Sequence, residues 1–290
     1  MSRTASSPSM FSTLQSTSTH RGGFGLDRES PVVVDRKVKA LLNQLTMERF
    51  ESISDQIIAW ANKSEKEKDG RTLIQVIKLI LEKATDEEMF SEIYARLCRK
   101  IMEQISPKVK DDGIKNSEGK PFAGGYLFIK YLLGRCQEGF ERGWVAKEAA
   151  AAATKATADK AIKLANEKTK GSEESGLYSD AAEAKRRGVG LTRFIGELFK
   201  LQMLTERIMH ECIKKLLGNV ENPEEEEIES LCKLLTTVGS MLDTPKARAH
   251  LDVYFLRMRE LTKNKSVNVR MVFMLQVCVH ILIPFAYDIH

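Results

Sequence analysis

The stretch RRGVGLTRFIGELFKLQML, residues 186–204, decides the fold class of this 290-residue chain. Gly188 and Gly190 have the G-x-G spacing of a dinucleotide-binding turn, but Arg193 occupies the position of the third glycine and no apolar strand precedes the pair. The apolar residues that follow recur at spacings of three and four: Leu191, Phe194, Ile195, Leu198 and Phe199. This spacing places them on one face of an α-helix, so the stretch predicts a helix packed on a core.

Upstream of this stretch, helical patterns recur with almost no strand alternation. Thr46 is expected to cap one helix, and Gly70 is expected to separate that helix from the next. Thr85 and Glu88 have the spacing of a capping box, which predicts that a third helix opens there. The run YLFIKYLLGRCQEGF, residues 126–140, carries the apolar stripe of a fourth helix.

Downstream, the chain contains four amphipathic segments. The first covers 191–203, Thr205 is expected to cap the second, acidic residues after Pro223 open the third, and the fourth covers 246–261. Their starts lie about 20 residues apart, so antiparallel pairs recur near the ~40 to 47 residue period of HEAT-type repeats. The sequence therefore predicts an all-α, right-handed solenoid of about five HEAT-like antiparallel helix pairs.

Composition divides the chain into regions. Residues 1–34 form an expected disordered tail, because twelve of the first 30 residues are Ser or Thr and few are large and apolar. The helical domain is expected to cover 35–276. An alanine-rich stretch over 145–178 offers little surface to bury and predicts a mobile insert. Residues 277–290 are an atypical apolar tail.

The apolar run from Met271 to Tyr287 has more than one interpretation. It falls short of the ~20 residues of a membrane span and includes Gln276, His280 and Pro284, so a membrane anchor is disfavoured. A buried last helix explains the part up to Gln276, whereas Pro284 and the apolar run after it have no obvious packing partner. Translation into an unspliced intron after Gln276 is a further hypothesis.

Charge and cysteine content limit the class of protein. A net charge of +5 is too small for the whole molecule to bind nucleic acid as a histone does, so any basic surface is local. The five cysteines are odd in number and widely spaced, which is typical of buried thiols in a reducing compartment. The N-terminus has no secretory signal pattern, so a cytoplasmic location is expected.

Two stretches imitate catalytic motifs. GIKNSEGKP, residues 113–121, resembles a phosphate-binding loop, but it has one intervening residue too many and Pro121 stands where Ser or Thr must bind magnesium. His210 and Glu211 begin a zinc-protease motif whose second histidine is replaced by Lys214. Neither motif is complete, so we expect a protein that is not an enzyme and has no cofactor, metal or small-molecule substrate.

The window 184–217 is the most informative surface, with eight basic residues against three acidic ones. Arg193, Glu197 and Lys200 are expected to lie on the helix face away from the core. Charge alone favours a solvated helix face. The exact residue sequence of the window, however, closely resembles that of a known domain family.

The window and five other blocks, in the same order, closely resemble the middle helical-repeat domain of the gamma scaffold subunit of eukaryotic translation initiation factor 4. The blocks are RKVKALLNQLT (36–46), YARLCRKI (94–101), YLLGRCQEGFERGW (131–144), ESLCKLLTTVGSMLD (229–243) and VRMVFMLQ (269–276). The resemblance covers about residues 35–276. It implies a translation initiation scaffold that binds the DEAD-box RNA helicase of the cap-binding complex, holds its two lobes in a productive relation, and contacts mRNA.

The resemblance also suggests which residues make these contacts. Candidates chosen for polarity on the resembling blocks are Asn43, Arg186, Arg187, Arg193, Glu197, Lys200 and Arg207. The scaffold's Tyr-x-x-x-x-Leu motif for the cap-binding protein is not found at any of the six tyrosines, so that contact is not expected. The alternative function is a direct RNA-binding helical solenoid in mRNA splicing or decay, where related domains also occur.

Overall fold

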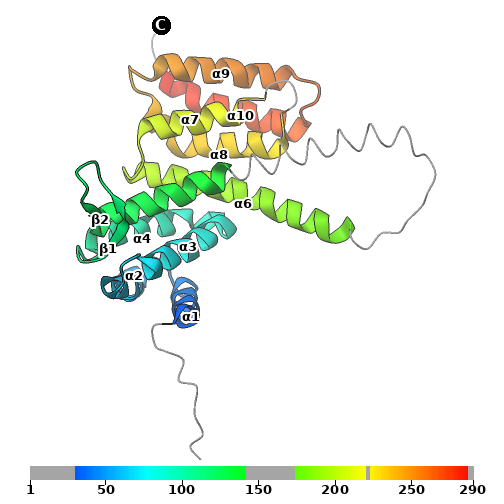
Figure 1. Ribbon diagram of the computed structural model, residues 1–290. Coiled ribbons are helices and arrows are strands. Elements are labelled where there is room, and N and C mark those ends of the chain that lie inside the picture. Colours follow the sequence, from blue (N-terminus) through cyan, green and yellow to red (C-terminus); the bar gives the residue numbers. More distant parts are fainter. Residues whose placement is uncertain (1–29, 142–173, 220–222, 287–290) are drawn as a thin grey trace, which may run out of the picture.

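The computed structural model describes residues 30–141, 174–219 and 223–286, which form a stack of helices (Figure 1). The first four are α1 (Pro31–Leu42), α2 (Phe50–Ala61), α3 (Arg71–Asp86) and α4 (Ser91–Gln104). A helix over 124–141 follows a short hairpin. The remaining helices are α6 (Glu174–Lys200), α7 (Glu206–Leu216), α8 (Glu225–Leu242), α9 (Arg248–Lys263) and α10 (Val269–Ala286).

Consecutive helices pair and the pairs stack. The second helices of the pairs form a continuous layer, because α2 packs on α4, α4 on α6, α6 on α8 and α8 on α10. Among the first helices, α1 packs on α3 and α7 on α9. Five pairs are present in the described parts of the chain, with the 124–141 helix preceding α6. The predicted all-α HEAT-like solenoid is confirmed.

Helix α6 lies at the centre of this stack, between the α1–α4 half and the α7–α10 half (Figure 1). From Val189 to Phe199 every residue except Arg193 is buried. Burial on nearly all sides follows from its packing against α3, α4 and α8. The opening stretch is therefore a core helix contacted on more than one face.

The glycines of the opening stretch differ in role. A Cβ at Gly190 would lie 2.1 Å from the carbonyl oxygen of Thr85, so the backbones of α6 and α3 touch at this point. Gly196 likewise faces the side chains of α8, with a Cβ position 3.2 Å from Thr237. A Cβ at Gly188 would meet nothing within 4 Å. The G-x-G spacing thus reflects helix packing at its second glycine.

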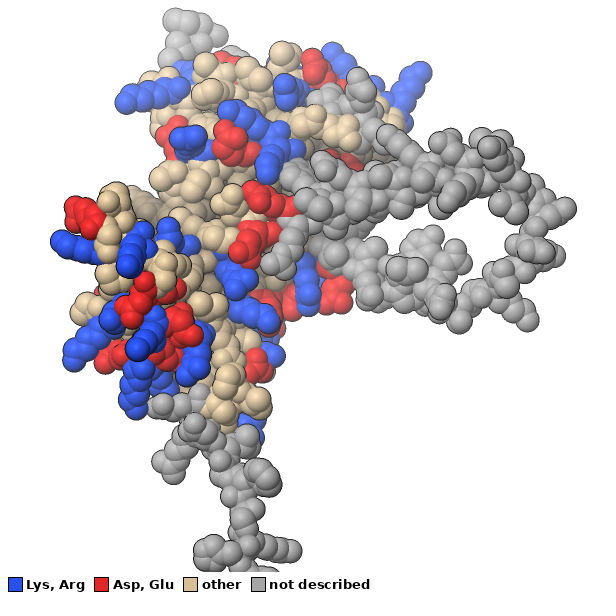
Figure 2. Space-filling view, viewed as in Figure 1, with Lys and Arg blue, Asp and Glu red and all other residues tan. Residues whose placement is uncertain are grey.

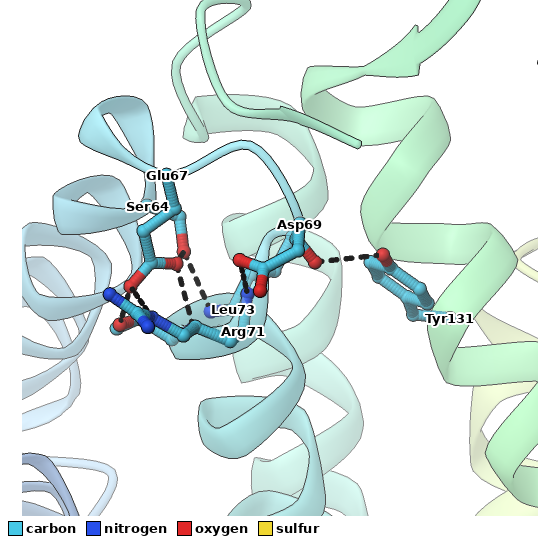
Figure 3. Close-up of polar contacts among 7 residues, drawn as sticks. Ser64, Glu67, Asp69, Arg71, Leu73 and Tyr131 are labelled. Atoms are coloured by element: carbon cyan, nitrogen blue, oxygen red, sulfur yellow. Dashed lines mark hydrogen bonds and ion pairs between the residues drawn. The ribbon is translucent and has the colours of Figure 1, made fainter. Parts of the chain in front are cut away.

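A network of polar groups fixes the start of α3 (Figure 3). The Glu67 carboxylate accepts hydrogen bonds from the Thr72 amide at 2.9 Å, the Thr72 hydroxyl at 2.6 Å and the Ser64 hydroxyl at 2.9 Å. The Leu73 amide donates to Ser64 Oγ at 2.8 Å. Gly70, with φ +59°, provides the left-handed turn before the helix. These bonds satisfy helix amides that have no partner within α3.

The stretch that imitates a phosphate-binding loop forms a β-hairpin. Strand β1 (Lys110–Lys115) pairs antiparallel with β2 (Pro121–Ala123). Asn116 Oδ1 accepts hydrogen bonds from the amides of Glu118 and Lys120 in the turn between them. Tyr131, on the 124–141 helix, donates to a carboxylate oxygen of Asp111 and holds the hairpin on the stack.

The predicted capping box at Thr85 and Glu88 is wrong. Helix α3 continues to Asp86, where buried Ala84 extends its apolar stripe, and Thr85 Oγ1 donates to the Glu82 carbonyl oxygen within that helix. Glu88 begins the short 3-10 helix η2 (Glu88–Phe90), and α4 starts only at Ser91. Thr205 does occupy the N-cap position of α7, but its side chain makes no capping hydrogen bond.

The structure also refines the ends of the expected regions. Helix α1 begins at Pro31, inside the predicted tail, and α6 begins at Glu174, inside the predicted insert. The rest of the predicted tail, residues 1–29, lies outside the described residues, and so does the part of the predicted insert before 174. None of the described helices is both long enough and apolar enough to cross a membrane.

The last helix does not end at Gln276. Helix α10 continues to Ala286, and Cys278, Val279 and Leu282 are buried. The Leu282 side chain would lie 2.5 Å from a Cβ at Gly239, which places it directly against α8. Helix α10 thus continues past the boundary expected at Gln276, and buried residues up to Leu282 pack on the stack.

Substituting Gly190 with alanine tests the contact between α6 and α3. Because the new Cβ meets a backbone oxygen rather than a movable side chain, we expect Gly190→Ala to lower the free energy of unfolding by about 2 kcal/mol or more. Gly188→Ala is the matched control and should stabilise the chain by up to about 1 kcal/mol, since its Cβ enters open space in a helix. Urea denaturation measures both. Equal effects at the two positions would contradict the close contact.

Substituting Glu67 with glutamine tests the network at the start of α3. Partial burial raises the pKa of Glu67, but the hydrogen bonds from Thr72, Ser64 and Arg71 outweigh burial and hold the pKa below its ordinary value of 4.5. We expect Glu67→Gln to cost about 1–3 kcal/mol of unfolding free energy at pH 7. The exposed Glu65→Gln is the control.

This stabilisation has a defined pH dependence. A lowered pKa in the folded state means that the contribution of Glu67 is complete above pH 4.5 and is lost as the pH falls through the folded-state pKa. The difference between wild type and Glu67→Gln should therefore shrink below pH 4.5 in urea titrations. A difference that stays constant down to pH 3 would show that the charge of Glu67 does not contribute.

Candidate functional site

A hollow of about 430 Å³ lies where the end of α3 and η2 meet α6 and α8. We call it the η2 corner. Its lining residues are Thr85, Asp86, Glu87, Glu88, Met89 and Phe90 from the α3–η2 segment, Arg186 and Val189 from α6, and Glu226, Glu229 and Lys233 from α8. The corner thus joins three parts of the sequence that lie about 40 to 140 residues apart.

Two apolar side chains of η2 point away from the core. Met89 is 71% exposed and Phe90 is 56% exposed. Arg193 Nη1 lies 3.7 Å from Met89 Sδ, so the α6 side chain borders this apolar pair. Met89 and Phe90 thus place exposed apolar surface at the lining of the hollow.

Ion pairs fix the geometry of the corner. Lys233 Nζ lies 2.8 Å from both carboxylate oxygens of Glu88 and 2.9 Å from Glu229 Oε1, which ties η2 to α8.

A second ion pair joins α6 to the end of α3, because Arg187 Nε lies 2.8 Å from Asp86 Oδ1. The hydrogen bond to Asp86 raises the pKa of Arg187, so this guanidinium stays charged.

The η2 corner is acidic, although the sequence window that leads to it is basic. Its lining residues include five acidic side chains and only two basic ones. Lys233, Arg187 and Lys83 pair with four of these acids, so the excess negative charge of the corner is small. An apolar pair surrounded by carboxylates suits a protein partner that presents apolar and basic side chains. Sequence reasoning missed the acids because they belong to helices far apart in the chain.

Three of the predicted contact residues lie at the corner. Arg186 lines it, Arg187 pairs at its edge, and Arg193 borders Met89. Arg187 is also engaged by Glu183 at 2.9 Å, which leaves less of its guanidinium for a partner.

Glu197 and Lys200 do not form an exposed pair of contacts. Glu197 is only 7% exposed, because α6 is covered on both sides, and its carboxylate pairs with Lys200 Nζ at 2.8 Å. The prediction that Glu197 faces solvent is wrong. Its charge is offset within the protein, and Lys200 alone of this pair is exposed.

Asn43 and Arg207 lie outside the corner. Asn43 is exposed at the C-terminal end of α1. Arg207 is exposed on α7 and lines other hollows. The predicted contacts therefore do not form one site.

Histidine and cysteine side chains are packed into the structure. His210 is buried, with 8% of its surface exposed. All five cysteines are free and buried. Burial raises the pKa of Cys136 to about 12 and that of Cys212 to about 11, which keeps these thiols protonated. Within the described residues, no three or more His, Cys, Asp or Glu side chains are grouped so as to hold a metal ion.

The stacked antiparallel helix pairs define a HEAT-like helical-repeat module. A family model described as the MIF4G domain matches residues 35–284. The chain belongs to the MIF4G domain family. Its match extends past Gln276, in agreement with the packing of α10.

Relatives of the chain carry initiation factor names. It is 53% identical over 255 residues to "Eukaryotic translation initiation factor 4 gamma" of Schizosaccharomyces pombe, a match to 87% of this chain and 17% of the relative. It is 40% identical over 252 residues to "Eukaryotic initiation factor 4F subunit p130" of Saccharomyces cerevisiae, a match to 83% of this chain and 26% of the relative. It is 39% identical over 248 residues to "Eukaryotic translation initiation factor 4 gamma 3" of Mus musculus, a match to 83% of this chain and 14% of the relative. The chain thus spans between 14% and 26% of the length of these relatives.

Proposed function

We propose that the chain is a scaffold module of translation initiation that acts in the cytoplasm, binds a DEAD-box RNA helicase and contacts mRNA. Its membership of the MIF4G family and the initiation factor names of its relatives support the first part. The proposal gives the chain no catalytic step of its own. Its contribution is to hold partners in a fixed relation.

The η2 corner carries the proposal of a protein partner. Met89 and Phe90 offer apolar area that a partner can bury, and the ion pairs of Lys233 hold η2 in place before binding. A fixed surface loses little conformational entropy when a partner docks. The surrounding carboxylates favour a helicase surface with Lys or Arg at its rim.

The stack of helices supplies a mechanism for activation. A DEAD-box helicase has two lobes, and a scaffold that contacts both binds some relative arrangements of the lobes better than others. Such differential binding shifts the helicase toward the favoured arrangement. We propose that the η2 corner holds one lobe, with Arg186 and Arg193 at its edge, and that a second patch elsewhere on the stack holds the other.

Substituting Met89 with alanine tests the corner. Because Met89 is exposed, Met89→Ala should leave the unfolding free energy nearly unchanged, while the lost apolar contact weakens helicase binding about tenfold. Isothermal titration calorimetry with the purified helicase measures the affinity. The exposed Met241→Ala on α8 is the control and should bind as wild type does.

The proposed function as a whole is tested by ATP hydrolysis. Adding the purified chain to the helicase, ATP and RNA should raise the rate of hydrolysis, and the chain and helicase should co-purify. No complex and no rise in rate would refute the scaffold function. RNA affinity in the absence of any helicase effect would favour the alternative of a direct RNA-binding solenoid.

A further inference from the structure

A second surface lies between α7 and α9. Two hollows, of about 480 Å³ and 310 Å³, both include Lys214 and His250 in their linings. Because they share these residues, the two hollows are adjacent, and we treat them as one surface. We call it the α7–α9 groove.

The floor of the groove is held in a fixed shape by His210. Its Nδ1 lies 3.0 Å from the Tyr254 hydroxyl, and its Nε2 lies 3.3 Å from Glu206 Oε1. The rings of His210 and His250 are 4.9 Å apart and tilted by 48°. Arg257 Nη1 also donates to the Leu217 carbonyl oxygen at 3.4 Å, which ties α9 to the end of α7. The two walls are therefore joined at several points.

Four exposed cations line the groove: Arg207, Lys214, Lys246 and Arg257. The acidic lining residues are Glu206, which contacts His210, and Glu211, which pairs with Lys214 at 3.4 Å. No carboxylate of the described residues pairs with Arg207 or Lys246. Figure 2 shows Lys and Arg side chains, with Asp and Glu side chains among them, over the part of the molecule where α7 and α9 lie. The groove thus has a positive balance, opposite to that of the η2 corner.

The spacing of these groups suits an extended polyanion. Arg207 and Lys214 are seven residues apart on α7, a rise of about 10 Å, and His250 and Arg257 have the same separation on α9. The α7 wall therefore presents positive charge along about two helical turns, and Lys246 and Arg257 add positive charge on the α9 side. On the α9 wall, the exposed residues His250 and Val253 add an aromatic ring and an apolar side chain to the lining.

We propose that the α7–α9 groove binds the phosphate backbone of single-stranded RNA, with a base stacked on His250. Arg and Lys side chains neutralise phosphates, and unpaired bases stack on histidine and arginine planes. An acidic peptide would share the charge attraction but has no regular planar groups for the ring. This assignment rests on the mRNA contact of the proposed function and gives that contact a place separate from the η2 corner.

The test uses the purified chain without helicase. Binding of a fluorescein-labelled 20-nucleotide oligo(U) is followed by anisotropy from 50 to 200 mM KCl. The double substitution Lys214→Gln and Lys246→Gln should weaken binding roughly tenfold or more at low salt. It should also reduce the slope of log K against log[salt] by about 1.4, since each lost phosphate contact to a single strand removes about 0.7. Helicase affinity should be unchanged.

The control removes equal charge elsewhere. Lys108→Gln with Lys115→Gln changes two exposed lysines near the hairpin and should leave RNA binding almost intact. Met89→Ala should weaken helicase binding while keeping RNA affinity, so failure of the groove and failure of the scaffold function give different results. Circular dichroism verifies that each variant is folded.

Three results would overturn the groove assignment. The first is unchanged RNA affinity in the groove variant, and the second is an equal loss in the Lys108 and Lys115 control. The third is a 20-residue polyglutamate peptide that binds at least as tightly as oligo(U) and loses affinity equally in the groove variant, because the groove would then select an acidic peptide. Loss of RNA affinity in the groove variant alone supports the proposal.

Discussion

The backbone contact between Gly190 of α6 and Thr85 of α3 is the constraint on which the rest of the structure depends. Only a residue without a Cβ fits at this distance, and the contact sets how deeply α6 lies between the two halves of the stack. The contact at Thr85 is next to Asp86 and η2, so the same approach brings Arg186 and Arg187 to the edge of the corner. The site is therefore a consequence of how closely two helices pack.

Local patterns predicted much of the fold. Apolar spacing identified the helices, and the left-handed Gly70 and the acidic start of α8 are decided by nearby residues. The prediction failed where tertiary contacts compete with local signals. Thr85 continues α3 although its sequence resembles a cap, and Glu197 is buried because a second layer covers the polar face of α6. A single helix pattern does not contain information about that second layer.

The candidate site was only partly predictable for the same reason. The basic window pointed to Arg186, Arg187 and Arg193, which do meet at one place. The charge of that place, however, is set by acids of α3, η2 and α8 that converge only in the folded chain. The basic groove also depends on residues about 40 positions apart, such as Arg207 and Lys246. Charge summed along the 184–217 window therefore predicted a single basic surface where the structure has two surfaces, the η2 corner and the α7–α9 groove.

The η2 corner and the basic α7–α9 groove are separate surfaces. In the proposed scaffold, a protein partner and an RNA strand therefore do not compete for one surface. The central claim is that this rigid stack holds a two-lobed helicase in a favoured arrangement. Single-molecule energy transfer between dyes on the two helicase lobes tests it most directly. The account predicts that adding the chain narrows the distribution of lobe distances toward one shorter value in the presence of ATP and RNA. An unchanged distribution at saturating chain would contradict it.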